Sequence, residues 1–109
     1  MSRGTLELLK LDRLIHDPTR LLILSFLYPV TKLDYLYLRK HLRLTAGNLS
    51  SHLAKLEKAG YVAIEKGFKG KYPQTVCGMT KKGRQMFELY AQMLKQLSRA
   101  AEGAGKAKP

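Results

Sequence analysis

One stretch of the chain, 45–60 (TAGNLSSHLAKLEKAG), restricts the fold more than any other. Its apolar residues Leu49, Leu53 and Leu56 are spaced by four and then by three, which is one narrow stripe of an α-helix. Thr45 is a favourable N-cap, because its hydroxyl can accept a hydrogen bond from an unpaired backbone N–H in the first turn. The sequence therefore predicts a helix that begins after Thr45 and buries a leucine stripe.

The end and the outer face of this helix also have a pattern. Gly60 stands where helices often end in the left-handed conformation. A merely solvated face usually mixes Glu with Lys at four-residue spacing, since such pairs stabilise a helix. The outer face here instead carries small polar groups and hardly any acid, and small donors and acceptors are what reach base edges and phosphates. Its members are Asn48, Ser51, His52 and Lys55, with Gly47 and Ser50 at the margins.

Residues 39–44 supply the end of a preceding helix and a tight turn. A helix, a tight turn and a second helix with a polar outer face are typical of a DNA-reading helix-turn-helix. Arg43 lies in the turn, where glycine would be the easiest residue, and a left-handed backbone there would cost about 1 kcal/mol.

The charge of the chain points to a polyanionic partner. Its 109 residues, enough for one domain, hold 20 Lys and Arg against 8 Asp and Glu, a net charge of +12. Nine of these net positive charges fall within 18–83. Nucleic acid is the first candidate partner and an anionic membrane surface the second. The alternative is that the charge only makes the surface basic and soluble and serves no partner.

Cysteine usage and hydropathy favour the cytoplasm. Cys77 is the single cysteine, so it cannot form an internal disulfide. The N-terminus lacks the pattern of a signal peptide. The densest apolar stretch, 21–30, is far shorter than a membrane span, so no membrane partner is expected.

Three helices are expected in the first part of the chain. The first, over 5–16, has leucines at helical spacing. Asp17 and Pro18 then end it and start a second helix, 18–28, because Asp is favoured at an N-cap and Pro at the first helical position. A third helix is expected to begin with Thr31 as its cap.

After Gly60 the apolar period changes from helical to alternating. Residues 62–65 and 75–79 read as two short strands. Between them, 67–74 is rich in glycine and lysine. Two strands around a basic tip predict a β-hairpin wing.

A last helix, capped by Thr80, is expected to run to about Ala100. Its apolar residues alternate steps of three and four, as in helix-on-helix packing. The domain is thus expected over 1–100, with 101–109 as a flexible basic tail. The expected fold is α+β, mainly α, with about five helices and a two-stranded wing.

The segments LDRLIHDPTRLLILSFL, LRKHLRLTAGNLSSHLAKLEKAGYVAIEKGFKGKYPQT and MTKKGRQMFE together resemble small, single-domain prokaryotic winged helix-turn-helix regulators of transcription. These are relatives of the MarR and ArsR groups. The resemblance covers about 11–97. Arg43 departs from it, because that position is usually glycine in the family.

The resemblance implies that helix 45–59 enters the major groove of DNA and that the hairpin 65–75 reaches the neighbouring backbone or minor groove. Its implied contacts on the reading helix are Thr45, Asn48, Ser50, Ser51, His52 and Lys55. Gly47, at the margin of the same polar face, is also a candidate contact. On the wing the resemblance implies Lys69 and Lys71. Arg39, Lys40 and Arg43 are added as flanking contacts, because their charges lie near the reading helix and would neutralise phosphates.

In that family the first and last helices commonly form a dimer interface. The residues that this implies here are Leu8, Leu11, Met86, Phe87, Tyr90, Met93, Leu94 and Leu97. A homodimer would present two reading helices to successive major grooves. A small hydrophobic effector could also sit between the first and last helices.

Metal and enzyme chemistry are not expected. His16, His41, His52 and Cys77 include no two residues within one helical turn, and no carboxylate cluster accompanies them. The chain has no phosphate-binding glycine loop and no recognisable nucleophile–base set. Neither a cofactor nor a metal is therefore expected.

Two rival functions stay open. One is an architectural protein that coats DNA with low specificity, which the high charge favours. The other is a winged-helix module for protein–protein interaction, which the basic outer face of helix 45–59 disfavours.

Overall fold

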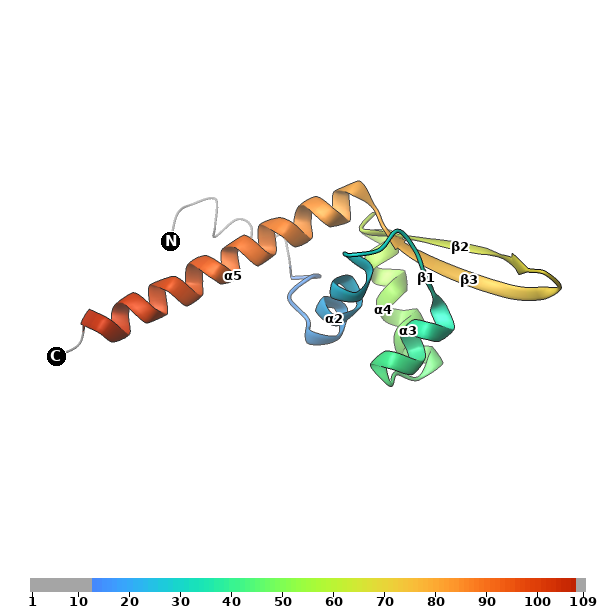
Figure 1. Cartoon of the computed structure of the whole chain (residues 1–109), viewed down its shortest axis with the longest axis horizontal. Helices are drawn as coiled ribbons and strands as arrows, with labels where there is room; N and C mark the ends of the chain where they lie inside the picture. Colours follow the sequence, from blue (N-terminus) through green and yellow to red (C-terminus); the bar gives the residue numbers. More distant parts are fainter. Residues whose placement is uncertain (1–12, 108–109) are drawn as a thin grey trace.

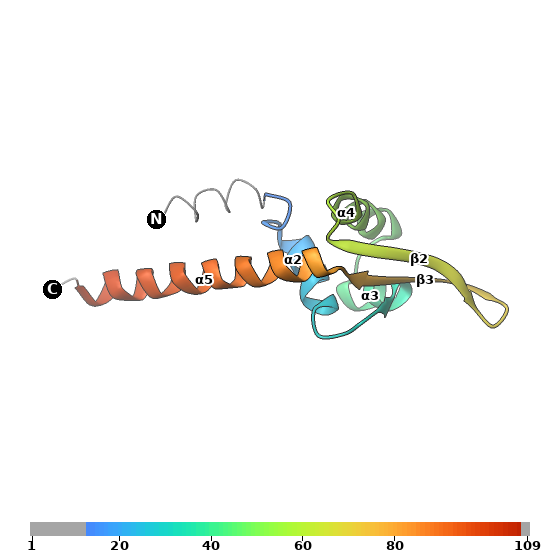
Figure 2. The ribbon, with the colours of Figure 1, turned by 90° about the horizontal axis from the view of Figure 1, so that it is seen from above.

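The computed structural model describes residues 13–107. Its elements, in chain order, are α2 (Pro18–Leu27), β1 (Leu33–Asp34), α3 (Tyr35–Leu42), α4 (Ala46–Lys58), β2 (Val62–Lys69), β3 (Tyr72–Met79) and α5 (Lys81–Ala107). The chain is elongated, with extents of 66 × 25 × 23 Å. Helix α5 and the β2–β3 hairpin extend in opposite directions from the part that α2, α3 and α4 form (Figures 1 and 2). The expected mainly helical winged-helix fold is confirmed.

The core lies where α2, α4 and the sheet meet. Leu49, Leu53 and Leu56 of α4 are buried, as their spacing predicts. Helix α2, which is apolar almost all round, buries three of its residues against them. The sheet adds Val62 and Cys77. The leucine stripe of α4 is therefore used by the chain's own packing, and the polar outer face points away from the core.

The sheet has three strands in the order β1–β3–β2, all antiparallel. The hairpin register runs from Val62 opposite Met79 to Lys69 opposite Tyr72. A two-residue turn joins the strands, and its first residue is Gly70 with φ of 62°. Glycine takes this left-handed conformation without steric cost, which is why it suits the first position of a tight hairpin turn.

The predicted helix caps are present. The Asp17 side chain accepts a hydrogen bond from the Arg20 N–H at 2.9 Å, and the Thr45 hydroxyl accepts one from the Asn48 N–H at 3.1 Å. Thr80 accepts from the Gly83 N–H at 3.0 Å at the start of α5. Local sequence chemistry thus defines where α2, α4 and α5 begin.

The third helix begins later than expected. Its N-cap is Asp34, whose carboxylate accepts from the Leu36 N–H at 3.2 Å, so the assignment of Thr31 as the cap is wrong. Leu33 and Asp34 instead form β1, the third strand, which pairs with Cys77 and Val76 of β3. The partner strand is more than forty residues away in sequence, so no local sequence pattern could predict this pairing.

The limits of the terminal helices also differ from expectation. Helix α5 continues to Ala107, beyond the expected end at Ala100. The alanines of this added segment favour a helix, whereas its two glycines disfavour one. The expected first helix, 5–16, lies mostly outside the described residues, as do Leu8 and Leu11. The part of this expected helix that the structure describes, 13–15, forms a turn. Residues 13–107 contain four helices.

Within 13–107, no helix combines the length and the apolar character that crossing a lipid bilayer requires.

Candidate nucleic-acid interface

The outer face of α4 carries a stripe of exposed polar side chains. Asn48, Ser51 and Lys55 lie three and four residues apart, which aligns them along one side of the helix. Their side chains make no hydrogen bond or ion pair with any other residue of 13–107. Amide, hydroxyl and ammonium groups are thus presented together to an external partner.

His52 lies beside this stripe and contacts Arg20 of α2. Its ring is half-buried, and its Nδ1 lies 3.2 Å from Nη1 of Arg20. The Arg20 Nε donates to the carbonyl of Leu14 at 2.5 Å, and its Nη2 is 3.9 Å from the Asp17 carboxylate. The Arg20 contact occupies Nδ1 of the imidazole. Nε2 is therefore the ring nitrogen that is available to an external partner.

The same group of contacts acts on Asp17. The backbone N–H of Arg20 is the main cause that lowers the pKa of Asp17, and the guanidinium of Arg20 adds to it, while partial burial opposes both. Asp17 therefore stays ionised next to Arg20. Sequence reasoning did not find the Arg20–His52 contact, because it joins two helices that are 32 residues apart.

Ser50 has a partner inside the protein. The Tyr35 hydroxyl donates to the carbonyl of Ala46 at 2.9 Å and lies 2.8 Å from the Ser50 hydroxyl. These bonds link the start of α3 to the first turns of α4. Ser50 thus contributes to the angle of the helix-turn-helix, and its contact with DNA stays a prediction.

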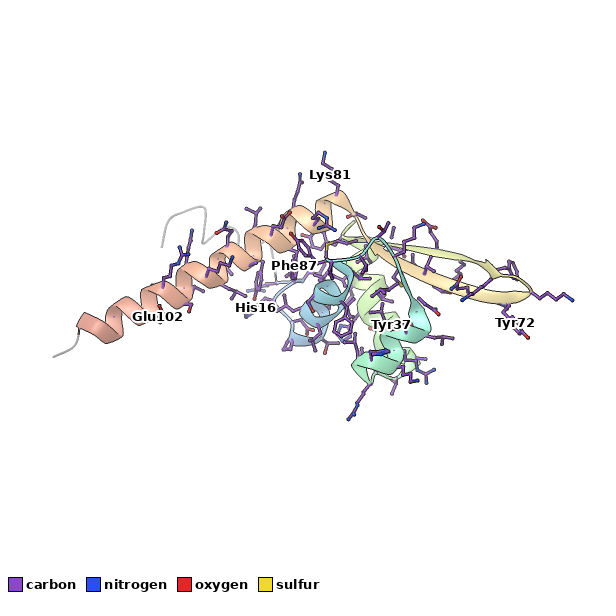
Figure 3. The ribbon with its side chains drawn as sticks, in the orientation of Figure 1. His16, Tyr37, Tyr72, Lys81, Phe87 and Glu102 are labelled. Carbon is purple, nitrogen blue, oxygen red and sulfur yellow. The ribbon has the colours of Figure 1, made fainter. Side chains whose placement is uncertain are left out.

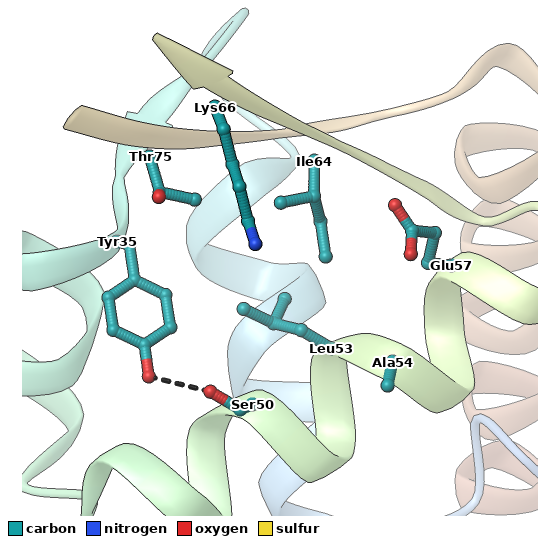
Figure 4. A pocket seen from close by; sticks show the side chains of 8 residues that line it. All are labelled: Tyr35, Ser50, Leu53, Ala54, Glu57, Ile64, Lys66 and Thr75. Carbon is teal, nitrogen blue, oxygen red and sulfur yellow. Dashed lines mark hydrogen bonds between the residues drawn. The ribbon is translucent and has the colours of Figure 1, made fainter. Parts of the chain in front are cut away.

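A cavity of about 560 Å³ separates α4 from the wing (Figure 4). Leu53, Ala54 and Ile64 form its apolar side, and the Lys66 ammonium points into it from β2. The remaining lining residues are Tyr35, Ser50, Glu57 and Thr75. Lys66 is not among the DNA contacts that the sequence predicts. The alternation of strand residues could have found it, because Lys66 shares a face with Ile64, which faces α4.

The flanking basic residues lie at the end of α3 and in the turn. Arg39, Lys40 and Arg43 are exposed, and Arg43 has φ of 54°, which is left-handed as its position requires. Cations in a last helical turn also interact favourably with the helix dipole. Arg39 and Lys40 therefore stabilise α3 as well as being available to phosphates.

The wing carries Lys66, Lys69 and Lys71, all exposed. Its Glu65 is paired with Lys32 at 2.9 Å. Residues 35–75, from the start of α3 to Thr75 in β3, include eight Lys or Arg but only two Glu. The α4 stripe, the turn and the wing thus belong to a strongly cationic stretch of the chain.

The expected dimer residues on α5 divide into two groups. Tyr90 and Met93 are only 2% exposed and belong to the chain's own core, with the Tyr90 hydroxyl bonded to His16 Nδ1. Met86 and Phe87 are half-buried against the same core. Leu94 and Leu97 are 44% and 41% exposed. Leu89, which sequence reasoning left out, is 50% exposed.

An apolar groove of about 310 Å³ lies between α2 and α5. Leu21, Leu22, Phe87 and Leu94 are among its lining residues. The position differs from the one expected for an effector, between the first and last helices, because the second helix provides one wall.

Cys77 and the histidines do not assemble into a metal site in the described part of the chain, where no three His, Cys, Asp or Glu side chains cluster. Cys77 is buried, and burial raises the pKa of its thiol to about 11. It is therefore protonated at neutral pH and packs as a small apolar side chain.

Comparison with known proteins agrees with this geometry. Residues 19–98 match the family model described as a winged helix DNA-binding domain. An uncharacterized protein of Methanocaldococcus jannaschii is 37% identical over 91 residues, which is 83% of this chain and 98% of that protein.

Solved structures are similar as well. The transcriptional regulator homologue of Pyrococcus horikoshii OT3 is 31% identical, with a TM-score of 0.82 over 90% of this chain and 97% of that one. A MarR-family regulator of Enterococcus faecalis V583, 19% identical, has a TM-score of 0.77 over 97% of this chain and 94% of that one, and so shares the fold. The chain therefore belongs to the winged-helix DNA-binding domain family, as a small DNA-binding transcriptional regulator.

Proposed function

We propose that the chain works as a homodimer that binds a specific double-stranded DNA sequence, with α4 in the major groove and the wing on the adjacent backbone or minor groove. The observation that carries this proposal is the α4 stripe of Asn48, Ser51 and Lys55. It is polar, cationic, exposed and unengaged within the described residues.

The division of labour follows from side-chain chemistry. Lysine and arginine neutralise phosphates and position the protein without reading sequence, whereas amide and imidazole groups can read base edges. Lys55, Lys66, Lys69 and Lys71 are therefore assigned to phosphates. Asn48 and His52 supply discrimination, and Arg20 orients the His52 ring.

The dimer follows from the apolar stripe of α5. In its first half, Met86, Tyr90 and Met93 cover the chain's own core. Helical spacing continues the same face through Leu94 and Leu97, which the described residues leave partly uncovered. A second copy is the partner that fits, because a twofold axis pairs such a stripe with itself. The groove between α2 and α5 fits a small hydrophobic effector.

The test compares salt dependence of DNA binding in single variants, measured by fluorescence anisotropy. Each lost phosphate contact lowers the slope of log K against log salt by about 0.9, so Lys55→Ala or Lys71→Ala in a bound dimer removes about 1.8. Lys81→Ala is the matched control, because Figure 3 shows Lys81 projecting from the start of α5, away from α3. An unchanged slope in both test variants contradicts the proposed footprint.

Other outcomes select the rivals. A change of about 0.9 per variant would mean that one protomer contacts DNA. Equal affinity for selected and unrelated duplexes would favour an architectural protein. Absence of duplex binding at low salt would favour a protein–protein module.

A further inference from the structure

Two aromatic side chains project at the far end of the wing. Phe68 is 73% exposed and Tyr72 78% exposed, the highest values among the large apolar and aromatic residues of 13–107. They flank the turn, and Figure 3 shows Tyr72 near the tip of the wing, where it lines a shallow pocket that Tyr35 and Leu36 of α3 also line. Neither ring contributes to the core, so neither is explained by folding.

The register places the two rings on opposite faces of the hairpin. Phe68 pairs with Pro73, and Tyr72 pairs with Lys69 one position further along. Side chains alternate between the faces of a strand, so Phe68 shares its face with Lys66 and Ile64. Those two residues line the cavity against α4. Phe68 therefore continues, towards the tip, the face of the wing that is turned to the reading helix.

The charge around the tip identifies the kind of partner. Lys66 lies on the same face as Phe68, Lys69 lies on the opposite face and Lys71 lies in the turn. The one acid of β2, Glu65, is paired with Lys32. An apolar ring with three cations within three positions along the chain complements a surface that is polyanionic at its edges and apolar between them. The minor groove of DNA has this character, with phosphates on both walls and stacked bases and sugars within.

We propose that Phe68 is a minor-groove wedge. When α4 occupies the major groove, the wing tip enters the neighbouring minor groove, where Phe68 inserts at a base step, unstacks it in part and bends the duplex. Lys69 and Lys71 hold the phosphates on either side. The proposal rests on the DNA binding proposed above and adds a contact and a distortion to it.

The experiment uses the duplex most enriched by the wild-type protein from a random library, with a dye at each end. Resonance energy transfer between the dyes reports bending. The wild type is expected to raise the transfer, as wedge proteins bend DNA by about 20–90°. Phe68→Ala should return it to the free-duplex value and weaken binding about tenfold. Its salt slope should not change, since no charge is lost.

Two control variants test whether the bend requires an apolar side chain at position 68. Phe68→Leu keeps an apolar wedge and should keep most of the bend. Tyr72→Ala removes an equally exposed ring from the opposite face and should keep the bend and the affinity. Because both positions are exposed, circular dichroism and the urea midpoint should match the wild type in all three variants.

The proposal is overturned if the wild type binds the duplex without bending it, if Phe68→Ala bends DNA like the wild type, or if Tyr72→Ala abolishes the bend while Phe68→Ala does not. If the library yields no enriched duplex, the proposed sequence-specific function fails, and the same bending assay on an unselected duplex decides the wedge: a bend that Phe68→Ala removes supports it, and no bend overturns it. The two failures are therefore distinguishable.

Discussion

Gly83 lies in the first turn of α5, where it should tolerate no side chain. A Cβ built on it would stand 2.1 Å from the carbonyl oxygen of Tyr61 and 2.8 Å from its carbonyl carbon. An ordinary carbon–oxygen contact is about 3.3 Å or longer, so Gly83→Ala requires a shift of about 1 Å between α5 and the start of β2. The same Tyr61 carbonyl accepts the Thr80 N–H at 3.0 Å, which that shift would strain.

Overpacking costs about 1–3 kcal/mol, and weakening the Thr80 hydrogen bond costs about 1 kcal/mol. Alanine recovers about 1 kcal/mol of helix propensity. The expected net loss in the free energy of unfolding is thus about 1–3 kcal/mol.

Urea denaturation followed by circular dichroism measures this loss as a lower midpoint with an unchanged m value. Gly47→Ala is the matched control, because a Cβ at Gly47 meets nothing within 4 Å and its backbone is not left-handed. It should raise stability by about 0.5–1 kcal/mol at most. If Gly83→Ala is as stable as the wild type, the close approach of α5 to Tyr61 is wrong.

The remaining predictions concern Cys77 and the α5 stripe. Because burial raises the Cys77 pKa from 9.0 to about 11, the unfolded chain releases this proton first, so stability should fall between pH 9 and 11. The urea midpoint of the wild type should therefore drop more steeply over this range than that of Cys77→Ala; parallel curves would refute the assignment. Leu97→Lys should convert a species of twice the chain mass into a monomer in light scattering, whereas Lys95→Ala, on the opposite side of α5, should not; a Leu97→Lys dimer would exclude the stripe as the interface.

Much of the fold is readable from local signals. The leucine stripe and the Thr45 cap of α4 are determined within one segment, as are the Thr80 cap and the alternation of β2 and β3. The left-handed backbone of Arg43 follows from its place in the turn. Each of these depends on residues within a few positions of one another, so a local pattern is enough to predict it.

What sequence reasoning missed depends on contacts between distant segments. The pairing of β1 with β3, the Arg20–His52 contact and the Tyr35–Ser50 bond each join separate elements. Tyr90 and Met93 lie on the same helical stripe as Leu97, so periodicity could not tell core from free surface. The apolar pattern gives the face of a helix but not what covers it.

The most direct test of the account is selection of duplexes from a random library by the purified full chain at defined salt. A homodimer with α4 in successive major grooves predicts an enriched inverted repeat, with half-site centres about 10 base pairs or a multiple of that apart. Asn48→Ala should change the preferred bases within each half-site. Recovery of no enriched sequence, or of a single unrepeated site that Asn48→Ala leaves unchanged, would contradict the claim that the outer face of α4 reads DNA as a dimer.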